Sequence, residues 1–328
     1  MTILPIILAG GQGTRMQSAL PKVLHPIAGK AMIQYVLDAV ADVTDEKPIV
    51  VVGHGADKVR DAVSERAMTA VQQQQLGTAD AVEAARALAQ GKGNLVLVAY
   101  SDMPCLRADT IHRICELQQQ NASAFSMLTT IQEDSHGFGR ILRNADGSVA
   151  AIVEEAQATA EQLLIKECNV GLYCFDADWL WESLPKIKLS PKGEYYLTDL
   201  VEIANQENRS VQALILTDIE EALGVNTRVH LSEAEAVIRR RINLQWMSRG
   251  VTMIDPQTTY ISPEVQIERD VTIYPNCWIE GKTLIQTGSS IGPFVLISNC
   301  SIGKNAMLQT TAVRNTIIPE NEVRIGGL

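Results

Sequence analysis

The sequence lacks both a long apolar run and an extended basic stripe. A membrane-spanning helix needs about 20 consecutive apolar residues, whereas the chain begins with only the short run "ILPIILA" and no basic flank. From that start we expect no secretory signal peptide. Lysine and arginine total 28 against 38 aspartates and glutamates, so the net charge is −10. An acidic chain without a basic stripe does not neutralise a nucleic-acid backbone. We therefore expect neither a membrane nor a nucleic-acid partner.

The six cysteines form no Cys-x-x-Cys pair, which is the usual spacing of thiolate metal ligands. In a chain of 328 residues they indicate reduced thiols, and hence a cytoplasmic protein. The length allows two domains, and 46% hydrophobic residues are enough to build a core in each.

The glycine-rich stretch "LAGGQGTRM" matches neither of the two best-known phosphate-binding motifs, because each of them requires a residue that is missing here. A dinucleotide fingerprint would have glycine where Met16 stands. A P-loop would continue with lysine after its last glycine, but Gly13 is followed by Thr14 and Arg15. Backbone N–H groups, Arg15 and the nearby Lys22 still favour recognition of a polyphosphate. The alternative is an ordinary tight turn with exposed cations.

Short aliphatic runs alternate with helical patterns over the first 230 residues. The runs "ILPIILA", "PIVVVGH" and "NLVLVAY" are separated by amphipathic segments such as "AMIQYVLDAVADV". This order predicts an α/β domain with a parallel sheet covered by helices on both faces. Ligands of such sheets bind at the carboxyl ends of the strands. Asp102 follows a strand there and is a candidate magnesium ligand; the alternative is a turn or helix-capping aspartate.

The last 70 residues follow a period of six. Isoleucines occupy positions 261, 267, 273, 279, 285, 291 and 297. This repeat predicts a parallel β-helix in which each isoleucine points to the axis, with Val265, Val271 and Val295 as a second inward set. The phase slips at Ile302, and the pattern decays towards the last residues.

A helix is expected between the two patterns, and it completes a division into residues 1–228, a linker of 229–250 and a truncated β-helix of 251–328. Ser232 and Glu235 have the spacing of a capping box, and Gly250 provides a stop. We interpret the basic triplet at 239–241 as a solvated or subunit-pairing face rather than a binding site.

Nine motifs resemble those of the sugar-1-phosphate nucleotidyltransferases, and most of all the bacterial bifunctional N-acetylglucosamine-1-phosphate uridyltransferase/glucosamine-1-phosphate acetyltransferases (GlmU). In order they are "LAGGQGTRM", "LPKVLHPIAGKAM", "QQLGTADAV", "YSDMP", "GFGRI", "IVEE", "CNVGLY", "GEYYLTD" and "GVNTR". The resemblance implies a Rossmann-like nucleotidyltransferase domain followed by a left-handed β-helix, assembled as a homotrimer.

The resemblance also implies an activity and its residues. UTP and N-acetylglucosamine 1-phosphate would give UDP-N-acetylglucosamine and pyrophosphate with Mg²⁺, supplying cell-envelope synthesis. Arg15, Lys22 and Asp102 would be catalytic, and Asp102 and Asn226 would hold the metal. The implied nucleotide contacts are Leu8, Ala9, Gly10, Gly11, Gly13, Thr14, Lys22, Gln72, Gly77 and Thr78. The implied sugar contacts are Tyr100, Gly139, Glu154, Asn169, Tyr196 and Thr198.

The chain departs from the family pattern at Ser101, where glycine is usual, and at Val170, where threonine is usual. Uridylyl transfer is therefore better supported than the identity of the sugar. One alternative is another sugar-1-phosphate nucleotidyltransferase, of the UDP-glucose, dTDP-glucose or mannose class. The other is a non-catalytic regulatory subunit, which would be expected to lose Arg15, Lys22, Asp102 or Asn226, although all four are present.

The second activity of the family is not expected in this chain. The acetyltransferase site of these enzymes uses a histidine as general base between coils of neighbouring subunits. Here no histidine follows His230, and the hexads number only enough for three or four coils.

Overall fold

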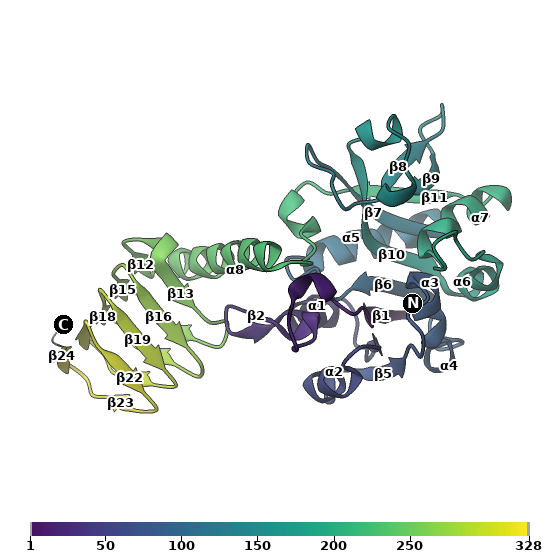
Figure 1. The fold of residues 1–328 in the computed structure, drawn as a ribbon. Coiled ribbons are helices and arrows are strands. Elements are labelled where there is room, and N and C mark those ends of the chain that lie inside the picture. The colour runs from purple at the N-terminus through teal and green to yellow at the C-terminus, as the bar shows by residue number, and fades with distance from the viewer. Residues whose placement is uncertain (1, 327–328) are drawn as a thin grey trace. The chain divides into compact units, whose positions relative to one another are not determined.

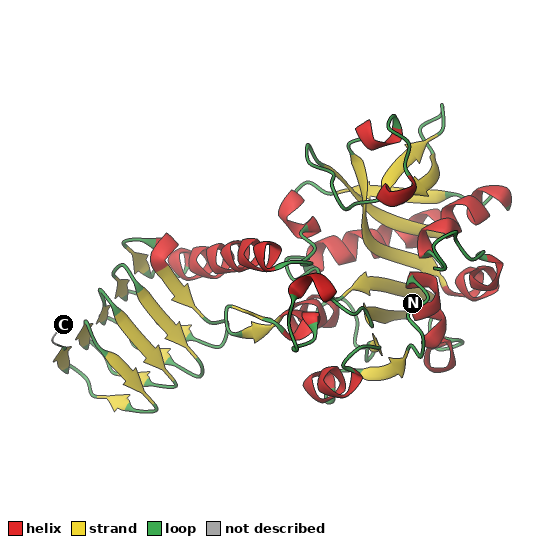
Figure 2. Cartoon of the chain, viewed as in Figure 1, coloured by secondary structure: helices red, strands yellow, loops and turns green. Residues whose placement is uncertain are grey.

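The computed structural model describes residues 2–326, which form two compact units (Figures 1 and 2). The first unit runs to His25 and resumes from Met32 to His230, while the second consists of Pro26–Ala31 and the chain from Leu231 on. Among the helices of residues 2–326, none is long and apolar enough to cross a bilayer.

The first unit is built on a nine-stranded sheet whose main order is β11-β7-β10-β6-β1-β4-β5. The strands along this path are β1 (Ile3–Ala9), β4 (Ile49–Val52), β5 (Met68–Val71), β6 (Leu95–Tyr100), β7 (Phe125–Ile131), β10 (Glu167–Asp176) and β11 (Val211–Ile215). The pair β8 (Arg140–Arg143) and β9 (Val149–Val153) branches from β10. The predicted parallel pairing of β1 with β4 and β6 is confirmed.

The sheet is mixed rather than purely parallel, and the expectation of a parallel sheet was wrong at β10. This strand runs antiparallel to both β6 and β7. Between β7 and β10 the chain forms β8, β9 and two 3₁₀ turns, but no crossover helix. A parallel connection requires a long crossover, so the chain returns in the opposite direction.

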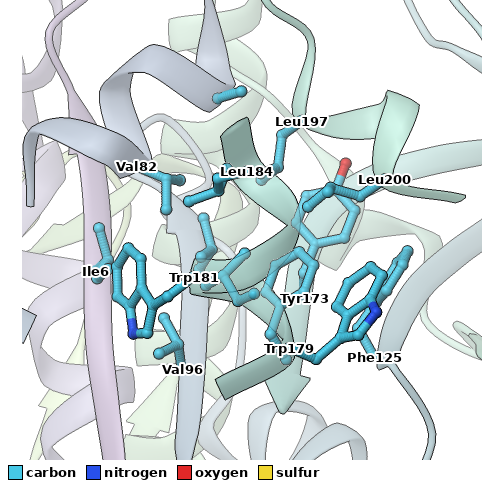
Figure 3. Close-up of a cluster of buried hydrophobic side chains, with 14 of the residues drawn as sticks. Ile6, Val82, Val96, Phe125, Tyr173, Trp179, Trp181, Leu184, Leu197 and Leu200 are labelled. Carbon is cyan, nitrogen blue, oxygen red and sulfur yellow. The ribbon is translucent and has the colours of Figure 1, made fainter. Parts of the chain in front are cut away.

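Helices cover the two faces of this sheet. They are α1 (Met32–Ala41), α2 (Ala56–Val63), α3 (Thr78–Ala84), α4 (Arg86–Ala89), α5 (Ala108–Asn121), α6 (Ala177–Ser183) and α7 (Leu200–Gln206). Alternate residues of β1 enter different cores, since Ile6 packs with α3, α6 and α7 while Ile7 packs with α1, α2 and α5. Figure 3 shows the first core, where Trp179 and Trp181 of α6 lie among aliphatic and aromatic side chains.

The second unit contains three ladders of short parallel strands, which together form the predicted β-helix. The first ladder is β12 (Thr252–Met253), β15 (Thr272–Ile273), β18 (Ser290–Ile291), β21 (Met307–Gln309) and β24 (Val323–Ile325). The second is β13 (Thr259–Ile261), β16 (Cys277–Glu280), β19 (Val295–Ser298) and β22 (Ala312–Arg314), and the third is β14 (Gln266–Ile267), β17 (Leu284–Ile285), β20 (Ser301–Ile302) and β23 (Ile317–Ile318). All seven hexad isoleucines are buried, as are Val265, Val271 and Val295, so both inward sets are confirmed.

The β-helix continues after the sequence pattern decays. Ile302 pairs with Ile285 and Ile318 pairs with Ile302, although each step is one residue shorter than the one before. Turns absorb the missing residue, and both side chains remain fully buried. The ladder register therefore survives the slip in the sequence.

Helix α8 (Arg228–Ser248) begins earlier than the capping-box letters predicted. The hydroxyl of Thr227 accepts a hydrogen bond from the N–H of His230 at 3.2 Å, so Thr227 caps the first turn and Ser232 lies inside the helix. Glu235 has a different partner: its Oε2 accepts from the N–H of Ala28 at 2.6 Å. Ala28 is the turn of a small hairpin, β2 (Pro26–Ile27) and β3 (Lys30–Ala31), whose place in the second unit the sequence did not reveal.

Candidate active site

A cleft of ≈ 540 Å³ opens beside the carboxyl ends of β1 and β6, near the middle of the sheet. This is the edge at which open α/β sheets bind their ligands. The cleft is lined by eleven of the predicted residues: Leu8, Ala9, Gly10, Gly11, Lys22, Gln72, Gly77, Thr78, Tyr100, Asp102 and Tyr196. The predicted residues outside its lining are Gly13, Thr14, Arg15, Gly139, Glu154, Asn169, Thr198 and Asn226.

The glycine loop leaves its backbone exposed to the cleft. A Cβ on Gly10 would lie 2.7 Å from Oε1 of Gln72, and one on Gly13, whose φ is +62°, would lie 2.8 Å from Cβ of Lys22. A Cβ on Gly11 would meet nothing within 4 Å. Among residues 2–326, no acceptor is recorded for the N–H groups of Gly11, Gln12 and Gly13. Such N–H groups are available to an anion.

Lys22, Asp102 and Asn226 converge at one point, although 204 positions separate Lys22 from Asn226. Lys22 belongs to the 3₁₀ turn Lys22–Leu24, and its Nζ lies 2.5 Å from Oδ2 of Asp102 and 3.0 Å from Oδ1 of Asn226. The N–H of Val225 donates to the carbonyl of Asp102 at 2.8 Å, which holds the segment carrying Asn226 against the end of β6. Two oxygen atoms therefore accept hydrogen bonds from a single cation, the Lys22 ammonium.

This donor set suits magnesium. A carboxylate and an amide oxygen are hard ligands, and Mg²⁺ is commonly held by one or two protein oxygens together with substrate phosphates and water. In the described part of the chain, no group of three or more His, Cys, Asp and Glu side chains could enclose a metal by itself. The residues present fit a metal shared with a phosphate substrate better than an all-protein cage.

Ser101 is accommodated without disturbing the cleft. Its side chain is buried, and its hydroxyl donates to the carbonyl of Leu8 at 2.6 Å. The N–H of Ser101 donates to the same carbonyl at 3.1 Å, so the ends of β1 and β6 are joined twice. The departure from glycine thus adds a hydrogen bond next to Asp102.

The amide of Gln72 is oriented by its neighbours. Its Nε2 donates to the carbonyl of Gly77 at 3.0 Å and to Oδ2 of Asp80 at 2.8 Å. Because both N–H bonds are directed towards these acceptors, Oε1 is the atom with remaining capacity, and it is an acceptor.

Gly77 joins the start of α3 to the segment that carries Tyr196. Its φ of +109° and ψ of −177° are a conformation that essentially only glycine adopts. A Cβ there would lie 2.4 Å from the carbonyl oxygen of Tyr195. The N–H of Tyr195 donates to Leu76 at 2.7 Å, and that of Leu197 donates to the Thr78 hydroxyl at 2.9 Å. These bonds hold one wall of the cleft.

Four of the six predicted sugar contacts form two hydrogen-bonded pairs. Thr198 donates to Oε1 of Glu154 at 3.0 Å, and the N–H of Asn169 donates to the carbonyl of Gly139 at 2.9 Å. Burial raises the pKa of the Glu154 carboxyl. Burial and then the charge of Glu154 raise the pKa of the Tyr100 hydroxyl, which ties this group electrostatically to the cleft wall. A bulge in β10 after Asn169 includes Val170, which is buried.

Comparison with known proteins agrees with this geometry. Residues 5–167 match the family of MobA-like NTP transferase domains. Proteins named "Bifunctional protein GlmU" are 42% identical over 319 residues in Geobacillus thermodenitrificans and 43% identical over 317 residues in Heliobacterium modesticaldum. These alignments cover 97% and 96% of this chain, and 68% and 69% of the relatives. The chain belongs to the GlmU family.

The first unit of this GlmU-family chain is accordingly a nucleotidyltransferase domain. The chain spans about 70% of a third GlmU relative, from Halalkalibacterium halodurans, which is 40% identical over 322 residues.

Sequence reasoning missed several residues that line the cleft. Gln12, Gln75 and Glu194 also line the cleft, and each lies inside or beside a motif that was recognised for other letters. Arg15 is exposed on the 3₁₀ turn Thr14–Met16, and no hydrogen bond or ion pair of its side chain is recorded within residues 2–326. Its role in phosphate binding stays a prediction.

Proposed function

We propose that this chain transfers the uridylyl group of UTP to N-acetylglucosamine 1-phosphate, giving UDP-N-acetylglucosamine and pyrophosphate. The single observation that carries the proposal is that Lys22 Nζ lies within 3.0 Å of both Asp102 Oδ2 and Asn226 Oδ1, and that Lys22 and Asp102 line the same cleft as the glycine loop. This arrangement supplies positive charge and metal ligands where a transferring phosphoryl group needs them.

The reaction is an in-line displacement at the α-phosphorus of UTP. A phosphate oxygen of the sugar phosphate forms the new P–O bond, the bond to the β-phosphate oxygen breaks, and pyrophosphate leaves. The N–H groups of Gly11 to Gly13 bind phosphate oxygens, and Lys22 neutralises charge near the α-phosphate. Arg15 turns from solvent towards the leaving pyrophosphate. Asp102 and Asn226 would hold Mg²⁺, which withdraws charge from the phosphates when bound.

The orientation of Gln72 favours a pyrimidine that carries an imide N–H. Oε1 is an acceptor, and the N3 position of uracil is a donor, whereas N3 of cytosine is an acceptor. A mismatch at this position would leave two acceptors facing each other, and an unpaired polar contact in a shielded site is strongly disfavoured. A hydrogen bond from the N3 position to Oε1 distinguishes UTP from CTP but not from dTTP.

The sugar half of the site rests on Glu154, Asn169 and their neighbours. The Oε1 of Glu154 already accepts from Thr198, and Nδ2 of Asn169 donates to the hydroxyl of Tyr173 at 2.7 Å. We assign the remaining capacity of these polar groups to sugar hydroxyls and the N-acetyl amide. Tyr100 and Tyr196 complete the wall.

A substrate panel tests the proposal. Pyrophosphate release is followed with UTP, dTTP, CTP and GTP, each combined with N-acetylglucosamine 1-phosphate, glucose 1-phosphate and mannose 1-phosphate. We expect the highest kcat/KM for UTP with N-acetylglucosamine 1-phosphate. A preference for glucose 1-phosphate or for dTTP would assign the chain to another nucleotidyltransferase class. No turnover in any combination would favour the regulatory alternative.

Two variants test the metal assignment within this function. Asp102→Ala and Asn226→Ala should each lower kcat by about a hundredfold or more, because the charge they organise matters most in the transition state. Asp57→Ala is the matched control, since that carboxylate lies on α2 with its side chain 93% exposed. Full activity in Asp102→Ala or Asn226→Ala would contradict the assignment.

We also propose a homotrimer built through the β-helix. Ile317 on β23 and Val323 and Ile325 on β24 are 73%, 58% and 63% exposed, so three exposed apolar side chains lie on the last two described strands. Light scattering should give three chains per particle, and a fully active monomer at micromolar concentration would refute this.

We expect no acetyl transfer from acetyl-CoA by residues 1–328, because no histidine occurs in 231–328. Release of free thiol from acetyl-CoA in the presence of glucosamine 1-phosphate would contradict this expectation.

A further inference from the structure

We propose that Lys22 is an internal counter-cation of the nucleotide-free enzyme: its ammonium occupies the metal position between Asp102 and Asn226 and leaves when metal and nucleotide bind together. This inference rests on the proposed metal assignment and goes beyond it. It makes binding of metal and binding of nucleotide two strongly coupled events.

The contacts of the three side chains support this role. The Lys22 and Asp102 side chains are only 14% and 17% exposed, so their ion pair is largely shielded from water. In the described residues, the ammonium is the one recorded partner of the Asp102 carboxylate and of the Asn226 amide oxygen. Both oxygens thus face the same cation, and Lys22 holds them on one side of the site.

The same point cannot hold two cations. An ammonium at 2.5 Å from Oδ2 of Asp102 fills the first coordination position of that oxygen. A divalent ion placed there would face the positive charge of Lys22 at close range, in a site where screening is weak. Metal binding to the free enzyme therefore requires the ammonium to move.

The surroundings of Lys22 suit such a movement of the ammonium. A Cβ on Gly13 would lie 2.8 Å from Cβ of Lys22, so the backbone of Gly13 is close to the root of this side chain, while the rest of its four-carbon stem can rotate. Lys22 and Gly11 line the same cleft, and Gly11 has open space beside it. Phosphates bound to the glycine loop would attract Lys22 away from Asp102, which frees the oxygens for metal. By linkage, the nucleotide then strengthens metal binding and metal strengthens nucleotide binding by the same factor.

Metal binding without turnover tests the proposal. Mn²⁺ is titrated into the full chain in the absence of nucleotide, and bound ion is measured by electron paramagnetic resonance. Lys22→Met removes the competing ammonium and should tighten Mn²⁺ binding on the order of tenfold. Lys22→Gln serves as a second neutral variant, with circular dichroism confirming that each is folded. Lys58→Met is the matched control, because it removes the same charge from an exposed position on α2.

A second measurement tests the coupling itself. UTP binding is measured at fixed free Mn²⁺ and in its absence, with no sugar phosphate present. The ratio of the two affinities should be large in the unmodified chain and should fall by about tenfold in Lys22→Met.

The outcomes distinguish a failure of the counter-cation proposal from a failure of the metal assignment. If both neutral Lys22 variants bind Mn²⁺ no more tightly than Lys58→Met, the counter-cation proposal is wrong while the metal site stands. If Asp102→Asn binds Mn²⁺ as well as the unmodified chain does, the metal assignment itself is wrong. Tighter binding in the Lys22 variants together with loss in Asp102→Asn supports both.

Discussion

Replacing Gly77 by alanine should damage both the stability of the first unit and its nucleotide cleft. The backbone of Gly77 has φ +109° and ψ −177°, and a Cβ would lie 2.4 Å from the carbonyl oxygen and 2.8 Å from the nitrogen of Tyr195. These neighbours are backbone atoms, so no side-chain rotation can relieve the clash. The loop segment that carries Tyr195 and Tyr196 would have to move away from the start of α3.

The expected loss is the sum of two physical effects. A non-glycine residue in this region of φ and ψ is strained by about 1–3 kcal/mol. Forcing an extra methyl group into a packed site adds about 1–3 kcal/mol. We expect Gly77→Ala to lower the free energy of unfolding by about 4 kcal/mol, taking the middle of both ranges. Displacement of the cleft wall should also raise KM for UTP.

Urea denaturation with Gly91→Ala as the control separates the two effects. Gly91 has φ +78°, but a Cβ there would meet nothing within 4 Å, so only the strain should appear. Gly91→Ala should therefore lose about 1–2 kcal/mol and keep its KM for UTP. Equal losses of stability in the two variants would refute the steric argument, and an unchanged KM in Gly77→Ala would refute the link to the cleft.

Three further changes test other parts of the molecule. Burial and the neighbouring Glu202 raise the pKa of Asp199 to about 6. The folded state therefore binds the Asp199 proton more tightly than the unfolded state does. The stability that this proton contributes is fully present below the unfolded pKa of 3.8 and is lost as the pH rises through 6. Asp199→Asn should thus raise the free energy of unfolding at pH 7.5 by about 1 kcal/mol, after allowance for partial exposure, and leave it nearly unchanged at pH 4; urea melts at both pH values measure this. Ile291→Ala leaves a cavity in the β-helix core, where Ile291 is fully buried, and should cost the second unit about 3 kcal/mol in thermal unfolding while UTP affinity is retained. Burial and then the Arg228 guanidinium lower the pKa of His25, so Arg228→Met should move that pKa back towards its ordinary value in an NMR titration; an unmoved pKa would show that burial alone sets it.

Some parts of the fold depend mainly on local patterns, and these could be predicted. The period of six places isoleucine on the axis of the β-helix, because a short strand and its turn repeat the same inward position in every coil. The helix of residues 32–41 was recognisable for the same kind of reason, since Met32, Ile33 and Val36 share one buried face. The glycine loop was recognisable because glycine is required where backbone approaches a ligand or another chain segment.

Other parts were decided by contacts between distant segments. The letters around Ser232 satisfy a capping box, yet Glu235 bonds to Ala28, which lies 207 positions away. The reversal of β10 depends on what the chain builds between β7 and β10, not on the residues of β10 itself.

The candidate site likewise has features that the sequence indicates and features that depend on contacts between distant segments. By itself, the sequence determined which residue types were available: a glycine loop, a lysine, an aspartate at the end of a strand and an asparagine in a later motif. Only the tertiary structure decided that the Lys22 ammonium lies within 3.0 Å of both Asp102 Oδ2 and Asn226 Oδ1. The physical reason is that local patterns follow from the geometry of a single helix or strand, whereas an ammonium shared by two side-chain oxygens depends on the packing of three segments that the sequence keeps far apart.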